Sequence, residues 1–254
     1  MPSRKATSLI LVSVFLIPIL SPSVAGEWTD DGWLTNLIGP ERMENGDEFG
    51  CHGFEDVDTK EENWVIEACK EYLVSHTDSS KWGQDPISFG ITGDYLDNQT
   101  ALALVNSGFL ITGDMIQNAP EGLVSFSRNG GTLEKNSANK ELLESAEEDS
   151  LVSIWWRARV DDIKVREDKD LMKWLEEQDV WFTTWGEWYL HEISSGNIEV
   201  NAQDNSLIIS NPTSPYAWDV PGTIILEIDE NIIEVYDNEG EQFPDLSITD
   251  RKLD

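Results

Sequence analysis

The chain is poor in cysteine, in histidine and in positive charge. It has two cysteines, three histidines and 17 lysine or arginine residues against 49 aspartate or glutamate residues, and its formal net charge is −32 at pH 7. Such a surface repels phosphate groups, so we expect no nucleic acid and no anionic membrane surface as a partner. Three hypotheses could explain the negative charge: solubility in a salty medium, binding of a divalent cation such as calcium, and attraction to a basic partner.

After residue 25 the sequence has no apolar run of the roughly 20 residues that a membrane span requires. The one long apolar run, Leu9–Leu20, follows a short basic start, is shorter than a span, and precedes small residues up to Ala25. This pattern predicts a secretory signal peptide over residues 1–25, with an uncleaved anchor as the alternative. Its removal leaves 15 basic and 49 acidic residues, a net charge of −34. We therefore expect a secreted or extracytoplasmic protein without a membrane span.

Several catalytic signatures are absent as well. The sequence has no serine-hydrolase elbow, no phosphate-binding loop, no HExxH helix and no dinucleotide-binding fingerprint. Any chemistry must therefore come from less characteristic residues.

Both cysteines and two of the histidines lie between Gly50 and His76. A zinc site is one reading, but Cys69 and His76 would stand two helical turns apart, about 10 Å along the axis. Cys51, His52 and His76 lack a fourth ligand at a recognised spacing, and a nucleophilic cysteine would need an orienting partner. A Cys51–Cys69 disulfide uses both cysteines and fits an exported chain, so we predict it.

The remaining pattern predicts a mixed fold. Apolar residues at helical spacing predict a helix over residues 61–76 and another over 169–178, and residues 81–126 resemble short strands separated by turns. A polar stretch over residues 128–150 is predicted to be a loop that leads into a short acidic helix, and it marks the seam between two lobes. Beyond it, further strands are predicted over residues 151–160, 180–193, 197–200, 206–210, 222–228 and 231–237.

These elements predict an α+β protein. Its first part would be a short mixed lobe over residues 26–135 that holds the disulfide. Its second part would be a β-rich, sandwich-like and mostly antiparallel lobe over residues 150–254, and the alternative is that both form one domain.

The tetrapeptide ITGD occurs twice, at residues 91–94 and 111–114. Asp94 and Asp114 are either a pair of cation ligands or turn residues at the ends of two strands, and Gly-Asp is a common turn pair. Between the copies, Asn98-Gln99-Thr100 matches the N-glycosylation sequon and predicts that Asn98 lies at the surface.

Six of the 11 tryptophans lie between Trp155 and Trp188. Strand alternation in the first predicted strand of this region puts Trp155, Arg157 and Arg159 on the face away from the core. Alternation in the second puts a further set on one face, unless Gly186 marks a bulge: Trp181, Thr183, Trp185, Glu187, Tyr189 and His191.

Aromatic rings beside hydrogen-bonding groups suit a flat, partly apolar ligand, so we expect carbohydrate-like binding at this surface. The predicted ligand-binding residues are Trp155, Arg157, Arg159, Trp181, Trp185, Tyr189 and His191. The alternative is that the tryptophans only build the core or the joint between lobes, as in a structural cell-surface protein.

A secreted glycosidase-like hydrolase is the competing hypothesis, with Glu187 as one of the two carboxylates that glycoside cleavage requires. The candidates for the second carboxylate are Glu192, Asp161, Asp162 and Asp219. The sequence does not choose among them.

Overall fold

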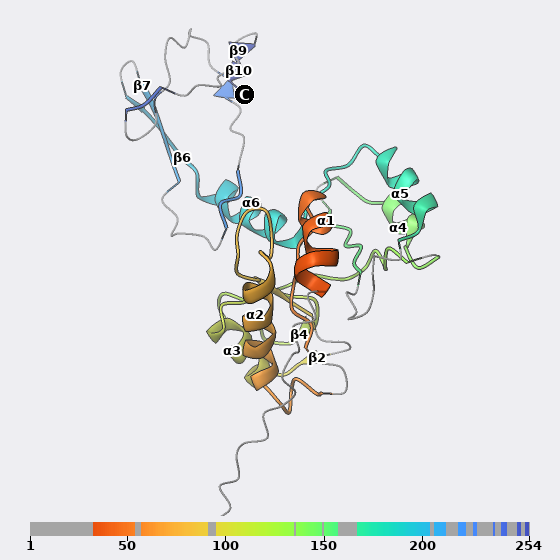
Figure 1. The fold of residues 1–254 in the computed structure, drawn as a ribbon. Coiled ribbons are helices and arrows are strands. Elements are labelled where there is room, and N and C mark those ends of the chain that lie inside the picture. Colours follow the sequence, from red (N-terminus) through yellow and green to blue (C-terminus); the bar gives the residue numbers. More distant parts are fainter. Residues whose placement is uncertain are drawn as a thin grey trace, which may run out of the picture. The chain divides into compact units, whose positions relative to one another are not determined.

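The structure, a computed structural model, describes most of the chain from Trp33 onward (Figure 1). The described residues are 33–53, 57–90, 95–134, 136–148, 150–156, 167–203, 206–211, 218–221, 226–227, 236, 240–242, 248–249 and 252–253. The predicted signal peptide lies outside these ranges. Within them, no helix is both long enough and apolar enough to cross a membrane.

Three helical segments form the first part of the chain. A short π-helix, η1 (Trp33–Ile38), continues into α1 (Gly39–Glu44), and α2 spans Trp64–His76. Helix α2 buries a stripe of residues about one turn apart, among them Val65, Cys69 and Leu73. The helix predicted over residues 61–76 is therefore confirmed, with a slightly later start.

A disulfide joins Cys51, in the loop before α2, to Cys69 in the helix. The two Cα atoms are 5.9 Å apart, and both residues are buried. Cys51 also pairs in parallel with Phe89, so the bond connects α2 to a small sheet. The predicted disulfide is confirmed, and because no thiol is free, the cysteine–metal and cysteine–nucleophile readings are excluded.

The sheet next to the disulfide is parallel. Its strands β1 (Ser88–Phe89), β3 (Ile111–Thr112) and β5 (Val124–Ser125) lie in the order β1-β3-β5. A second parallel pair joins β2 (Tyr95–Leu96) to β4 (Met115–Ile116). Short strands were predicted here, but helix α3 (Asn98–Asn106) between β2 and β3 was missed.

Helix α3 begins at a well-formed cap. The Asp97 side chain accepts hydrogen bonds from the backbone N–H groups of Gln99 and Thr100, both at 2.9 Å. Asn98 of the predicted sequon is the exposed first residue of this helix, whereas Thr100 is fully buried. Glycosylation of Asn98 stays a prediction.

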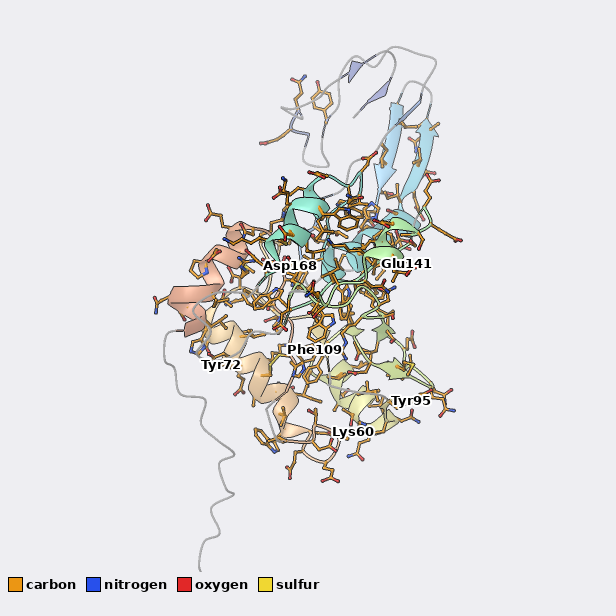
Figure 2. The ribbon with its side chains drawn as sticks, turned by 90° about the vertical axis from the view of Figure 1, so that its right-hand side faces the viewer. Lys60, Tyr72, Tyr95, Phe109, Glu141 and Asp168 are labelled. Atoms are coloured by element: carbon orange, nitrogen blue, oxygen red, sulfur yellow. A yellow bond between two sulfur atoms is a disulfide. The ribbon has the colours of Figure 1, made fainter. Side chains whose placement is uncertain are left out.

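The first hydrophobic core lies between α2, α3 and the parallel strands. Phe109, labelled in Figure 2, is fully buried. Its ring meets that of Phe89 edge-on, with centroids 5.3 Å apart. Lys70 of α2 donates a hydrogen bond to the carbonyl oxygen of Ser107, after α3, at 2.8 Å. This core comprises Leu34, Ile38, Phe49, Cys51, Ile66, Cys69, Leu73, Phe89, Leu96, Ala101, Leu104, Phe109 and Leu123.

The second part of the described chain begins with α4 (Lys140–Glu144) and α5 (Lys169–Glu176), which confirm the two predicted helices there. Helix α6 (Trp185–Asn197) leads into an antiparallel hairpin of β6 (Glu199–Gln203) and β7 (Ser206–Ser210). A small antiparallel sheet joins β8 (Leu226–Glu227), β10 (Lys252–Leu253) and β9 (Ile248–Thr249) in that order.

A second core joins residues from both sides of the predicted seam. Its buried members are Ile87, Ile111, Leu190 and Trp218, with Trp185, Tyr189 and Phe126 packed against them. Trp218 donates a hydrogen bond from its indole N–H to the carbonyl oxygen of Asp85 at 2.8 Å. Helix α6 is thereby anchored on the parallel sheet.

The predicted β sandwich is wrong. Residues 185–193, expected in a strand, belong to helix α6, and residues 151–156 contribute only a single parallel bridge between Trp155 and Thr132. The described sheets are small, and those over residues 88–125 are parallel. The aromatic and threonine content of residues 180–189 favours strands, but the helix cap at Thr184 and packing against the second core favour a helix.

Replacing both Cys51 and Cys69 with alanine should lower the free energy of unfolding by about 3 kcal/mol, because the bond closes a loop of 18 residues in the unfolded chain. Urea denaturation of the variant and of wild type, each with and without a reductant, measures the loss. Reduction should weaken wild type by a similar amount and leave the variant unchanged. An equally stable variant would contradict a stabilising role for the bond.

Candidate functional site

The predicted aromatic face is divided by helix α6. In a strand, residues 181, 185, 189 and 191 would share one face, but in a helix neighbours on a face are three or four residues apart. Trp181 precedes α6, and Trp185, Tyr189 and His191 lie within it. The structure accordingly separates these side chains into an exposed set and a packed set.

The exposed set is built on Trp181. Its ring contacts Trp188, with centroids 5.7 Å apart and planes inclined by 44°, and meets His191 edge-on at 5.1 Å. Trp188 and His191 are three residues apart, so both lie on one face of α6. We call these three residues the aromatic platform. Trp181 keeps 55 % of its surface exposed.

The platform continues into the segment before α6. Val180 and Phe182, on either side of Trp181, are 52 % and 60 % exposed. Three consecutive large apolar residues are therefore open to solvent, where single exposed ones are ordinary. Strand reasoning missed Trp188, because alternation assigned it to the opposite face.

Polar groups adjoin the platform through His191. Its Nδ1 atom is buried without a hydrogen-bond partner and lies 3.7 Å from a carboxylate oxygen of Glu192, whose side chain is 57 % exposed. Glu192 is four residues after Trp188, so it belongs to the same helix face. An exposed carboxylate therefore stands beside the His191 ring of the platform.

The packed set comprises Trp185 and Tyr189. Both meet the ring of Phe126 edge-on, at 5.9 and 6.5 Å between centroids. Trp185 also donates a hydrogen bond from its indole N–H to Ser153 Oγ at 2.7 Å. These two predicted ligand-binding residues therefore help to attach α6 to the rest of the protein.

Trp155 lies in a different environment. The Arg128 guanidinium stands over its ring, 5.6 Å from the centroid, and also pairs with buried Asp114 at 3.1 Å. Asp114 thus has an intramolecular cation, while Asp94, its counterpart in the other ITGD copy, lies outside the described residues.

Four other predicted residues, Arg157, Arg159, Asp161 and Asp162, also lie outside the described residues. Among the residues that the structure does describe, no three histidine, cysteine, aspartate or glutamate side chains gather as a metal site. A calcium site therefore stays a prediction without a location.

Glu187 forms the cap of helix α6. Thr184 Oγ1 accepts a hydrogen bond from the Glu187 backbone N–H at 3.2 Å, and the Glu187 carboxylate accepts one from the Thr184 N–H at 2.9 Å. This reciprocal pair is a capping box, and T-x-x-E is its sequence signal. That signal in residues 184–187 predicts the start of a helix and was overlooked.

Other groups occupy the remaining hydrogen-bonding positions of the Glu187 carboxylate. It accepts hydrogen bonds from the Trp82 indole N–H and, at 3.3 Å, from the Thr183 hydroxyl. Lys81 Nζ lies 3.7 Å from Oε1. A carboxylate accepts about four hydrogen bonds, so little capacity remains for a substrate.

Glu48 is the second carboxylate at the start of α6, and sequence reasoning missed it. It accepts hydrogen bonds from Ser88 Oγ at 2.6 Å and from the Gly186 backbone N–H at 2.8 Å. These contacts join the loop before Cys51 to strand β1 and to a helix 138 residues later. No local pattern indicates a contact over that separation.

The environment of Glu48 raises its pKa above the ordinary value of 4.5. Burial is the main cause, because it disfavours the charged form. Hydrogen bonds from Ser88, Gly186 and Thr184 lower the pKa in part, whereas the negative charge of Glu187 raises it. Of the proposed partners for Glu187, Glu192 and Asp219 are exposed at the surface, whereas Glu48 is the carboxylate that interacts electrostatically with Glu187.

No protein-family model matches this chain, and no curated protein and no solved structure shows significant similarity to it. Functional inference therefore depends on the residues themselves.

Gly186→Ala should destabilise the protein by about 1–3 kcal/mol, because the added methyl group would overlap the ring of buried Trp218. Gly196→Ala is the matched control. It lies in the same helix with open space around it, so the better helix propensity of alanine should stabilise by up to about 1 kcal/mol. Urea denaturation measures both, and equal effects would contradict the close approach of α6 to Trp218.

Glu48→Gln should become more stable relative to wild type as pH rises above 4.5. An acid whose pKa is raised on folding binds its proton more tightly in the native state, so wild-type stability falls as pH rises through the folded-state pKa. The variant has no ionisable group at position 48, so its stability does not fall in this way as pH rises. The measurement is the difference between the two free energies of unfolding at several pH values from 4 to 8.

Asp97→Asn is the opposite control for that experiment. Hydrogen bonds from Thr100 and Gln99 lower the pKa of Asp97, so its contribution is present above the ordinary value of 3.8 and is lost in acid. The stability deficit of this variant should therefore stay nearly constant from pH 4 to 8 and shrink only at lower pH. A Glu48→Gln difference that stays flat, or follows the Asp97→Asn trend, would contradict the raised pKa.

Proposed function

We propose that this protein is an exported binding protein whose ligand is a carbohydrate stacked on the aromatic platform. The observation that carries the proposal is that Trp181 is exposed to solvent and yet held in position by neighbouring rings. Its ring keeps 55 % of the residue surface open to solvent, yet Trp188 and His191 hold it in place. The confirmed disulfide fits an oxidising compartment, and the predicted signal peptide provides the route there.

Exposure of this apolar surface favours a binding role over a packing role. Val180, Trp181 and Phe182 are each more than half exposed, and adjacent exposed apolar residues mark interaction sites more often than isolated ones do. Burying them against a ligand would recover hydrophobic free energy that folding leaves unused.

The platform is also pre-organised. Trp188 and His191 are fixed on α6, and Trp181 is restrained by contact with both. Little side-chain entropy is then lost when a ligand stacks on the rings. Sugar rings suit such a surface, since their C–H faces pack on aromatic rings while His191 and Glu192 can bond their hydroxyl groups.

The hydrolase hypothesis gains no such support. A catalytic Glu187 would need an oxygen free to meet the substrate, but both oxygens are engaged by the helix cap, Thr183, Trp82 and Lys81. We therefore assign Glu187 to positioning α6, and the ligand-binding residues to Trp181, Trp188 and His191. Trp185 and Tyr189 would act only through the packing of the helix.

Trp181→Ala should weaken binding at least tenfold, the equivalent of about 1.4 kcal/mol, because it removes the most exposed ring of the platform. Isothermal titration with a panel of neutral and charged hexasaccharides measures the affinity. The free energy of unfolding should change by less than about 0.5 kcal/mol, as expected for a surface side chain.

Trp64→Ala is the matched control. Trp64 is also exposed, at the start of α2, and its indole N–H bonds to Glu62 at 2.9 Å. Its replacement should leave the affinity unchanged. Equal binding by wild type and Trp181→Ala, or saturable binding of no sugar in the panel, would contradict the proposed function.

A further inference from the structure

We propose that the ligand of the aromatic platform is positively charged, and that it is a glycan of free amino sugars such as β-1,4-linked glucosamine. This inference rests on the proposed function and specifies its ligand class. Four observations carry it: the pairing of other tryptophans with cations, the lack of a lysine or arginine over the platform rings among the described residues, the carboxylate of Glu192 beside His191, and the net charge.

Three tryptophans of this protein already carry an intramolecular cation. Lys81 lies 4.7 Å from the ring centroid of Trp82, Arg128 lies 5.6 Å from that of Trp155, and Lys140 lies 5.3 Å from that of Trp174. Distances below about 6 Å allow the negative face of an indole ring to attract a cation. The chain has only 17 lysine and arginine residues, so three of its few cations are used in this way.

The platform differs from these three sites. Among the described residues, no lysine or arginine lies over the ring of Trp181 or Trp188. Trp181 is nevertheless 55 % exposed, so its ring face is accessible. An ammonium group of a ligand can therefore take the position that lysine or arginine takes elsewhere in this protein.

Carboxylates stand where such an ammonium group would need them. Glu192 shares a helix face with Trp188, its carboxylate is 3.7 Å from the ring nitrogen of His191, and its side chain is 57 % exposed. Asp179, two residues before Trp181, is exposed as well. A ring face and a carboxylate together bind an ammonium group more strongly than a neutral hydroxyl group.

The charge of the whole chain acts in the same direction. At −32, it concentrates cations near the surface and repels sugars that carry carboxylate or sulfate groups. Amino sugars combine this charge with the stacking face on which the proposed function depends. A neutral sugar would use the rings and the hydrogen-bonding capacity of Glu192, but not its negative charge.

The test compares three β-1,4-linked hexasaccharides that differ at one position of each ring. Glucosamine hexamer carries ammonium groups, N-acetylglucosamine hexamer carries neutral amides, and cellohexaose carries hydroxyl groups. We expect the glucosamine hexamer to bind at least tenfold more tightly than both neutral hexamers in isothermal titration at pH 6.5. Raising NaCl from 50 to 500 mM should reduce that advantage, because salt screens charges near the surface.

Two pairs of variants separate the platform from diffuse charge attraction. Trp181→Ala should weaken every hexamer that binds, whereas Trp64→Ala should weaken none. Glu192→Gln should weaken the glucosamine hexamer about threefold or more and leave cellohexaose unchanged. Glu67→Gln removes the same charge from an exposed position on α2 and should have no such effect.

The outcomes distinguish this inference from the function on which it rests. Equal affinity for the three hexamers, with loss on Trp181→Ala, would overturn the amino-sugar inference and keep carbohydrate binding. Tight binding of the glucosamine hexamer that ignores Trp181→Ala would reveal attraction to the acidic surface in general and overturn it too. No binding of any hexamer would overturn both proposals.

Discussion

The fold around the candidate site depends on how helix α6 begins. Two carboxylates lie at its first turn. Glu48, 138 residues earlier in the chain, accepts a hydrogen bond from the Gly186 N–H. Glu187, within the first turn itself, caps the helix and accepts a hydrogen bond from the indole N–H of Trp82. Acceptors at this end satisfy backbone N–H groups that have no partner within the helix, and negative charge there is favoured by the helix dipole. Because Gly186 lacks a side chain, Trp218 can pack directly against the same turn. The position of every platform residue within α6 follows from this junction.

The same junction has an energetic cost. Burial and the neighbouring charge of Glu187 both disfavour ionisation of Glu48, as the raised pKa indicates. A protonated Glu48 still accepts the Gly186 N–H and avoids repulsion between the two carboxylates, so the geometry tolerates the acid better when it is neutral. A buried acid of this kind contributes little net stability, and its specific partners, Ser88 and Gly186, fix the register of α6 on strand β1. The register places Trp188 and His191, both half-buried, where they contact Trp181.

Local sequence pattern was sufficient for some elements and not for others. Helices α2 and α5 follow from apolar spacing, and the disulfide follows from there being only two cysteines. Helix α6 was missed because the β-propensity of its aromatic residues was given more weight than the capping box at residues 184–187, and that error moved Trp188 to the wrong face. The contact of Glu48 with Gly186 spans 138 residues, so only the tertiary fold brings the two together. Composition therefore indicated the region in which the proposed site lies, and strand periodicity assigned the side chains of this region to the wrong faces.

The tryptophans around α6 differ in how much they contribute to the stability of the fold. Trp218 is 2 % exposed and Trp185 packs on Phe126, so both stabilise the attachment of the helix. Leu190, 1 % exposed, completes that buried face. Trp181 precedes α6 and is 55 % exposed, and it contacts Trp188, which is half-buried on the other side of the helix. A tryptophan that is more than half exposed adds little to the core, so the exposed position of Trp181 near acidic residues fits the proposed ligand-binding role better than a packing role.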